Sequence, residues 1–264
     1  MFMTIDSEGI WRIIATQAGT PCVILATLWH QPRQLKHSLL QHKSPTFASI
    51  CFALLLGAGG ILLFTPVFGL DFDRLQQSLI SRFGPAPIPL FKEWQRMLAD
   101  GRNSQESEKL KRVNDFFNRR IVFNDDITIW GESDYWATPV ESIGRGQGDC
   151  EDFSIAKYYS LIELGIPVAK LRLVYVKALQ NGAPGGASQQ AHMVLAYYAT
   201  PSADPLVLDN LVVDIRPASR RTDLSPIFSF NSAGLWQGTG NQSSKSNLSR
   251  WQTLLQRARQ EGFE

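Results

Sequence analysis

One short stretch of the sequence holds the residue types that nucleophilic chemistry requires. Residues 144–153 read Gly-Arg-Gly-Gln-Gly-Asp-Cys-Glu-Asp-Phe, so a glycine-rich turn leads to Cys150 at the predicted start of a helix. The unpaired N–H groups and the dipole of a helix N-terminus favour the thiolate, which is the reactive form of cysteine. The same N–H groups can stabilise an oxyanion together with a side-chain donor, for which Trp136 and Gln147 are the candidates.

A nucleophilic thiol needs a base, and imidazole is the usual one because its pKa lies near neutrality. His192 is the only histidine beyond residue 42. The imidazole in turn needs an acceptor that fixes its orientation. Asp209 is the first candidate for this acceptor, but a regular hairpin is expected to carry it away from His192, so Asp204 and Asp214 compete with it.

Three carboxylates surround the thiol in sequence: Asp149, Glu151 and Asp152. Negative charge at this position repels a thiolate and raises the pKa of the cysteine. Acidic residues often cap a helix N-terminus, but adjacent residues cannot all do so. A hard cation with oxygen ligands would neutralise the cluster, and Ca²⁺ is the cation we expect outside the cytoplasm.

An apolar segment precedes all of these residues. The range Pro45–Leu70 contains no charged residue, and positive charges lie before it. This pattern is typical of a secretory signal or an N-terminal anchor, and we interpret residues 1–69 as a leader with its apolar run at 47–69. Cleavage after Gly69 is the favoured alternative, although the run is also long enough to span a bilayer, which takes about 20 residues.

Export changes what the cysteines can do. Cys22 and Cys51 lie before or within the apolar run, which leaves Cys150 as the only thiol of the exported portion. In an oxidising compartment such a cysteine has no partner within the chain and is either inert or kept free for chemistry. From residue 70 onward, 22 Lys and Arg balance 22 Asp and Glu, so no electrostatic footprint for nucleic acid is present.

The remaining sequence predicts the elements that position these residues. Helices are expected at 71–83, at 90–99, from Ser104 or Ser107 to Arg119, after a capping box at Thr138–Glu141, and from Cys150 to Leu164. Residues 121–130 are predicted to form a loop or a short edge strand. Strands are expected at 170–177, 191–199 and 206–210, with a flexible hairpin loop at 180–190.

This order of elements predicts an α+β fold in which a central helix packs on an antiparallel sheet. The helix that starts at Cys150 is apolar on most of its sides, which is typical of a buried helix. We expect one domain over residues 70–235. Residues 236–264 follow as a C-terminal tail, in which a terminal helix is expected over 247–262.

Four segments together resemble a known family. They are Gly-Asp-Cys-Glu-Asp-Phe at 148–153, Tyr-Trp-Ala-Thr-Pro at 135–139, Ala-His-Met-Val at 191–194 and Leu-Asp-Asn at 208–210. The sequence resembles the bacterial transglutaminase-like cysteine proteinases over about residues 70–230, and most of all their LapG-type members.

The resemblance implies a papain/transglutaminase-like fold and a protease with a Cys150–His192–Asp209 triad. It also implies calcium dependence, with Asp149 and Glu151 as ligands and Asp152 as a further one. The implied setting is the periplasm, where the protease cuts the N-terminal region of a large surface adhesin at a paired-alanine site and so controls biofilm attachment. The implied partner is an inner-membrane cyclic-di-GMP receptor that sequesters the protease.

Two other functions use the same residues. The triad serves equally for acyl transfer to an amine, as in transglutaminases. A catalytically inactive module that holds a peptide in the cleft is the second alternative, although intact Cys, His and Asp candidates speak against it.

Overall fold

The computed structural model describes residues 3–5, 11–13, 70–183, 186–238, 240, 243–244 and 248–263. The chain divides into two compact units, Met1–Leu63 and Phe64–Glu264. In the first unit, a short antiparallel hairpin joins β1 (Met3–Ile5) to β2 (Trp11–Ile13). The apolar run at 47–69, which we interpreted as part of a leader, lies outside the described residues. Among the residues that are described, no helix is long and apolar enough to cross a membrane.

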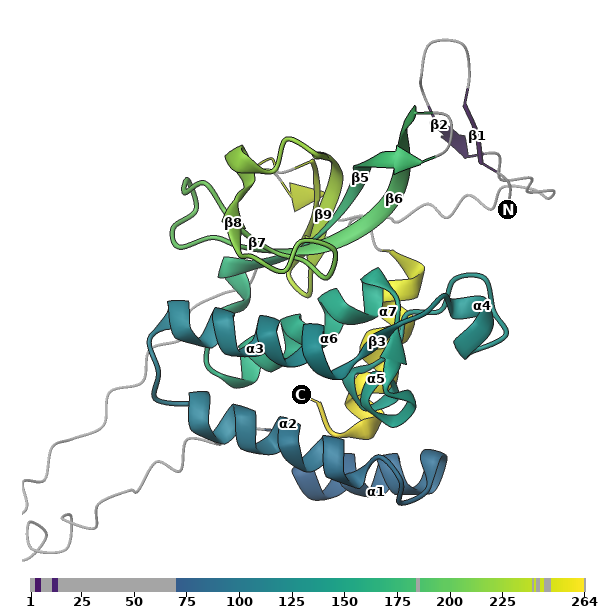
Figure 1. The fold of residues 1–264 in the computed structure, drawn as a ribbon, viewed down its shortest axis with the longest axis vertical. Helices are drawn as coiled ribbons and strands as arrows, with labels where there is room; N and C mark the ends of the chain where they lie inside the picture. Colours follow the sequence, from purple (N-terminus) through teal and green to yellow (C-terminus); the bar gives the residue numbers. More distant parts are fainter. Residues whose placement is uncertain are drawn as a thin grey trace, which may run out of the picture. The chain divides into compact units, whose positions relative to one another are not determined.

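The second unit begins with three helices (Figure 1): α1 (Phe72–Phe83), α2 (Ile88–Gly101) and α3 (Glu106–Arg120). All three were predicted. The proposed serine cap of α3 was wrong, because the helix starts after Gln105 and has no side-chain cap. The predicted inner face of α3 is buried and comprises Leu110, Val113, Asn114 and Phe117.

The segment after α3 contains a short strand and a short helix. Strand β3 (Val122–Phe123) pairs in parallel with β4 (Gln147–Gly148), which directly precedes the cysteine. Helix α4 (Asp126–Ile129) follows β3. The expectation of a loop or short edge strand over residues 121–130 was therefore correct only for the first half of that range. The parallel pair holds this segment against the nucleophile turn.

The next two helices start at caps that the sequence indicated. Helix α5 (Pro139–Arg145) begins with the predicted capping box, in which Thr138 and Glu141 exchange backbone-to-side-chain hydrogen bonds of 2.7 and 3.2 Å. Helix α6 (Cys150–Glu163) is the central helix, and every residue from Asp152 to Leu161 is buried. Its burial agrees with its apolar surface, which covers most of its sides.

A seven-stranded antiparallel sheet covers one side of the helices, in the order β11-β10-β9-β5-β6-β7-β8 (Figure 1). Its strands are β5 (Leu171–Ala183), β6 (Gly186–Tyr197), β7 (Leu206–Leu208), β8 (Arg216–Pro217), β9 (Leu224–Asn231), β10 (Gly234–Gln237) and β11 (Ser243–Ser244). The 3₁₀ turn η1 (Val168–Lys170) directly precedes β5, and the 3₁₀ turn η2 (Ala218–Arg220) lies between β8 and β9. The α+β architecture is confirmed.

Two features of the sheet differ from the expectation. The predicted hairpin loop at 180–190 is mostly strand, because β5 and β6 continue their pairing toward the tip of the hairpin. Strand β9 was missed, although it pairs with β5 in the middle of the sheet. The strand was not predicted because the sequence beyond Pro217 is rich in polar residues. Phe228 and Phe230 are two residues apart, as in a strand, but the buried residue between them is the polar Ser229.

The sheet has an apolar core on each face. One face packs on the helices through Leu171, Leu173, Met193, Leu195, Leu208 and Phe230. The opposite face forms a second, smaller cluster from Val174, Val176, Val194, Ala196, Tyr198 and Val207. Because side chains alternate along a strand, β5 and β6 contribute to both clusters.

The C-terminal helix α7 (Ser249–Glu261) belongs to the main core. The Trp251 ring lies 5.7 Å from that of Tyr158 in α6 and 5.3 Å from that of Phe230 in β9. Arg257 forms an ion pair of 2.8 Å with the buried Glu141 and donates to the carbonyl of Trp136. The helix was expected, but the boundary at residue 235 divides a core that is continuous.

We predict that Trp251→Ala lowers the free energy of unfolding by about 3–5 kcal/mol, because removal of this buried aromatic ring leaves a cavity between α7, α6 and β9. Urea denaturation followed by circular dichroism measures this change. The matched control is Gln252→Ala, at the exposed neighbouring position in the same helix. Equal stability of the two variants would mean that α7 is only an appended tail.

Candidate active site

Cys150 is the first residue of α6, as predicted. Asp149 is the N-cap, and its side chain accepts hydrogen bonds from the N–H groups of Glu151 at 3.1 Å and Asp152 at 3.4 Å. The thiol lies next to strand β6: the backbone of Met193 forms a hydrogen bond with it, and Ser154 donates to the Met193 carbonyl at 3.0 Å. The helix cap and the sheet together therefore fix the position of the sulfur.

His192 and Asp209 form a buried pair. Nε2 of His192 lies 2.8 Å from Oδ1 of Asp209, and the two residues are 3% and 1% exposed. The register of β6 and β7 explains their contact. Leu195 pairs with Leu208 in the antiparallel ladder, so Asp209, which follows Leu208, lies beside Val194. That position is on the His192 side of the strand and diagonal to it, so the hairpin does not separate the two residues as expected.

The competing acids lie elsewhere. Asp204 accepts hydrogen bonds from the backbone and the hydroxyl of Ser219. The side chain of Asp214 is 75% exposed and pairs with Arg216 at 2.9 Å. Of the three candidates, the structure therefore brings Asp209 to the histidine.

The Asp209 carboxylate is held in its charged form. Burial raises its pKa, but hydrogen bonds and charge from His192, the N–H of Leu211 and the Arg221 guanidinium outweigh burial and lower the pKa to about 2. A charged carboxylate accepts a hydrogen bond from the Nε2–H group of the imidazole. This arrangement leaves Nδ1 without a proton, so Nδ1 is the nitrogen that can act as a base.

The thiol has the opposite environment. Burial, followed by the negative charges of Glu151 and Asp149, raises the pKa of Cys150 far above its ordinary value, and the hydrogen bond from Met193 lowers it only in part. The Cys150 sulfur lies 2.7 Å from Oε2 of Glu151. The helix N-terminus alone therefore does not bring the pKa of this thiol below its ordinary value.

These carboxylates form a cluster that includes one residue the sequence did not indicate. Asp126, Asp149 and Asp152 each place an oxygen within 4.8 Å of the others. A second group consists of Asp149, Cys150 and Glu151, whose carboxylate oxygens and sulfur also lie within 4.8 Å of one another. Sequence reasoning predicted Asp149, Glu151 and Asp152 but missed Asp126, which lies in α4 and reaches the cluster through the β3–β4 pair.

The cluster fits a hard cation. Oδ1 of Asp126 is buried and has no hydrogen-bond partner among the described residues, while Oδ2 accepts from the N–H of Tyr135 at 2.6 Å. Burial and the neighbouring carboxylates raise the pKa of Asp126 to about 6 and that of Asp149 to about 10. Buried oxygen ligands whose negative charges oppose each other are the donor set that Ca²⁺ binds.

The two oxyanion candidates both lie near the start of α6. The loop that carries Trp136 is tied to the helix by a hydrogen bond of 2.7 Å from the N–H of Ala137 to Asp152. Nε1 of Trp136 is buried and has no partner in the described structure, so it is a donor without an acceptor. Gln147 accepts from Asn124 at 2.9 Å through Oε1, which leaves its amide nitrogen as the possible donor.

Comparisons with known proteins agree with this site. Residues 95–227 match the family model described as bacterial transglutaminase-like cysteine proteinase BTLCP. The calcium-bound structure of Legionella pneumophila LapG is 37% identical, with a TM-score of 0.61 over 70% of this chain and 98% of that one. The chain belongs to the bacterial transglutaminase-like cysteine proteinases.

As a member of this family, the protein is a LapG-like cysteine protease with the transglutaminase-like α+β fold. Two further structures of Legionella pneumophila LapG are similar to it, each with a TM-score of 0.61 over 72% of this chain and 98% of that one. The first is 37% identical, and the second, which is EGTA-treated, is 36% identical. A comparison with curated proteins found no match.

The glycine before the N-cap gives a direct test of the carboxylate cluster in this protease. A Cβ on Gly148 would lie 2.7 Å from Cβ of Asp152, which is completely buried and cannot move aside. We predict that Gly148→Ala displaces Asp152 and weakens Ca²⁺ binding at least tenfold, as a change next to a metal ligand typically does. Isothermal titration calorimetry with CaCl₂ measures this. An unchanged affinity in a folded variant would exclude Asp152 from the site.

Proposed function

We propose that this chain is a calcium-dependent cysteine endopeptidase of the periplasm, which cleaves the N-terminal region of a large surface adhesin and so controls biofilm attachment. One observation carries the catalytic part of the proposal: a thiol at the N-terminus of a buried helix lies beside the strand that holds a buried histidine–aspartate pair. Family membership supports the reaction class, and the LapG-type resemblance supports the substrate.

In the proposed mechanism, Cys150 attacks the scissile carbonyl carbon while His192 takes the thiol proton at Nδ1. Asp209 holds the imidazole through Nε2 and stabilises the imidazolium. The negative charge that develops on the carbonyl oxygen is stabilised by the N–H groups at the start of α6 and by the indole N–H of Trp136, which is buried without another partner.

The second half of the reaction returns the site to its starting state. The imidazolium donates its proton to the leaving amine, and the C–N bond breaks to give a thioester between the substrate and Cys150. His192 then removes a proton from water, which attacks the thioester carbonyl. Collapse of this intermediate releases the acid and restores the thiol proton from His192.

Asp126, Asp149, Glu151 and Asp152 are the proposed calcium ligands. When bound there, Ca²⁺ supplies positive charge that compensates the carboxylates around the thiol. The support lies in the unpartnered oxygen of Asp126 and in the similarity to LapG, of which calcium-bound and EGTA-treated structures exist.

The proposed cellular setting follows from the apolar run at 47–69, which would export the chain or anchor it in the inner membrane. There an inner-membrane cyclic-di-GMP receptor would sequester the protease until the adhesin is to be released. The resemblance to LapG-type members supports both the receptor and the adhesin.

The catalytic assignment predicts three different outcomes from three single substitutions. Cys150→Ala abolishes cleavage of the N-terminal region of a candidate adhesin, because no other group replaces the nucleophile. Asp209→Asn lowers kcat by about 10³- to 10⁴-fold, as loss of the orienting carboxylate does in other triads. The control Asp214→Asn, at an exposed ion pair, leaves kcat unchanged.

Gel electrophoresis and mass spectrometry of the products provide the measurement. Persistent cleavage in Cys150→Ala would end the proposal. A product joined to an added primary amine in place of the hydrolysed peptide would identify an acyl transferase instead.

The calcium assignment predicts that EGTA removes activity and that excess CaCl₂ restores it. In Asp126→Asn the half-maximal CaCl₂ concentration rises at least tenfold, because one charged ligand is lost. Asp125→Asn is the matched control, since this neighbouring carboxylate lies outside the cluster. Full turnover in excess EGTA would contradict calcium dependence, and equal behaviour of the two variants would remove Asp126 from the ligand set.

A further inference from the structure

Arg221 is a buried charge that the proposed mechanism does not use. It follows the turn η2 and is 3% exposed. Its Nη2 donates to Oδ2 of Asp209 at 2.7 Å, while His192 holds the other oxygen of the same carboxylate at 2.8 Å. The Asp209 carboxylate therefore contacts the imidazole through one oxygen and the Arg221 guanidinium through the other.

A second carboxylate fixes the guanidinium. Asp223 accepts from Nε of Arg221 at 2.9 Å and from Nη2 at 2.7 Å, so the two side chains form a two-pronged ion pair. This geometry uses the planar fork of arginine, which lysine does not have. The result is a continuous chain of contacts that runs from Asp223 through Arg221 and Asp209 to His192.

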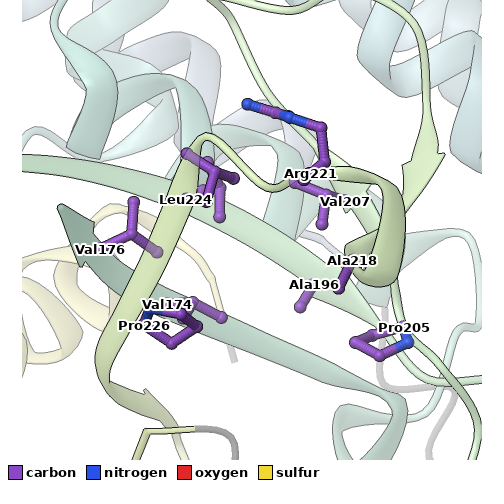
Figure 2. A pocket seen from close by; sticks show the side chains of 10 residues that line it. Val174, Val176, Ala196, Pro205, Val207, Ala218, Arg221, Leu224 and Pro226 are labelled. Atoms are coloured by element: carbon purple, nitrogen blue, oxygen red, sulfur yellow. The ribbon is translucent and has the colours of Figure 1, made fainter. Parts of the chain in front are cut away.

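The surroundings of Arg221 leave little freedom for this arrangement. The chain of contacts borders a cavity of about 100 Å³ on the sheet face opposite α6. Figure 2 shows aliphatic side chains around the cavity, among them Val176, Val207 and Leu224, with Arg221 at one edge and its guanidinium directed away from them. The apolar walls line one side of Arg221, and its guanidinium points away from them and donates to Asp209 and Asp223.

Stability alone is a weak explanation for such a group. A buried ion pair contributes little net stability, because desolvation of both charges offsets their attraction. The backbone carbonyl of Asp209 is already fixed by Asn118 at 2.8 Å and by the buried Lys157 at 3.1 Å. The contact that Arg221 adds is to Oδ2 of the side chain, whereas His192 and the N–H of Leu211 hold Oδ1, so Arg221 helps to fix the rotation of the carboxylate relative to the imidazole.

We propose that Arg221, held by Asp223, is a positioning residue of the protease: it fixes the Asp209 carboxylate in the rotation that orients His192 toward Cys150. This inference rests on the triad of the proposed function. It assigns a role in the reaction to the segment between η2 and β9, which contributes no member of that triad.

Arg221→Lys is the main test, because it keeps the positive charge but removes the fork. The probe is iodoacetamide, and mass spectrometry follows alkylation of the Cys150 peptide in the full chain with CaCl₂ present. We expect the alkylation rate at neutral pH to fall about tenfold to hundredfold, since a displacement of about 1 Å in an active site has effects of this size. Asp223→Asn is expected to give a smaller loss in the same direction.

A double-mutant cycle separates positioning from a general structural role. In an Asp209→Asn background, Arg221→Lys is expected to have no further effect on the alkylation rate, because its action passes through the Asp209 carboxylate. Independent losses that multiply in the double variant would overturn the proposal. Arg216→Lys is the matched control, since this arginine pairs with Asp214 at the surface and is expected to keep the wild-type rate.

His192→Ala distinguishes failure of the inference from failure of the proposed function. A slow rate in His192→Ala together with a wild-type rate in folded Arg221→Lys would overturn the inference and leave the triad intact. Wild-type rates in both variants would overturn the triad and the inference with it. If Arg221→Lys fails to fold, Asp223→Asn decides, because its side chain is 35% exposed and its loss leaves the buried pair of Arg221 and Asp209 in place.

Discussion

The crowding of negative charge at the N-terminus of α6 is the constraint on which the rest of the site depends. Asp149 and Asp152 cap the helix, and Asp126 joins them from a different element. Two of these carboxylates are buried and that of Asp149 is half-buried, so desolvation and the repulsion between them together raise the pKa of Asp149 to about 10. The thiol is affected in the same way, because burial and the charges of Glu151 and Asp149 raise the pKa of Cys150 and disfavour its thiolate.

The histidine side of the site has the opposite electrostatic arrangement. There a single carboxylate is surrounded by donors, and its pKa falls to about 2 although it is almost fully buried. The two halves meet where α6 packs against β6. The fold thus separates a crowded group of carboxylates from a carboxylate whose charge is compensated by Arg221.

The sequence predicted those parts of the site that depend on local signals. Cys150 follows a glycine turn at a helix start, the capping box at Thr138 has a characteristic spacing, and His192 stands alone beyond the apolar run. Asp126 could not be found in this way, because it reaches the cluster only through the parallel pairing of β3 with β4, which is a contact between distant segments.

Long-range pairing also explains the errors in the fold. Strand β9 was missed because it lies in a stretch rich in polar residues and has no regular apolar alternation, yet its partner β5 places it in the middle of the sheet. Helix α7 was predicted from its own periodicity, but nothing local indicates that Trp251 packs against α6 and β9. Arg221 was missed for the same reason, since its role depends on a contact across 12 residues of chain.

The position of α7 has a consequence for the order in which the core around α6 is completed. All proposed calcium ligands and the nucleophile precede residue 153, whereas Trp251 and Arg257 complete the core around α6 and hold the carbonyl of Trp136. During synthesis from the N-terminus, Cys150 therefore emerges about a hundred residues before Trp251, which packs against α6 from the last helix. The packing of Trp251 on α6 and the contact of Arg257 with the Trp136 carbonyl are therefore completed only when this last helix docks.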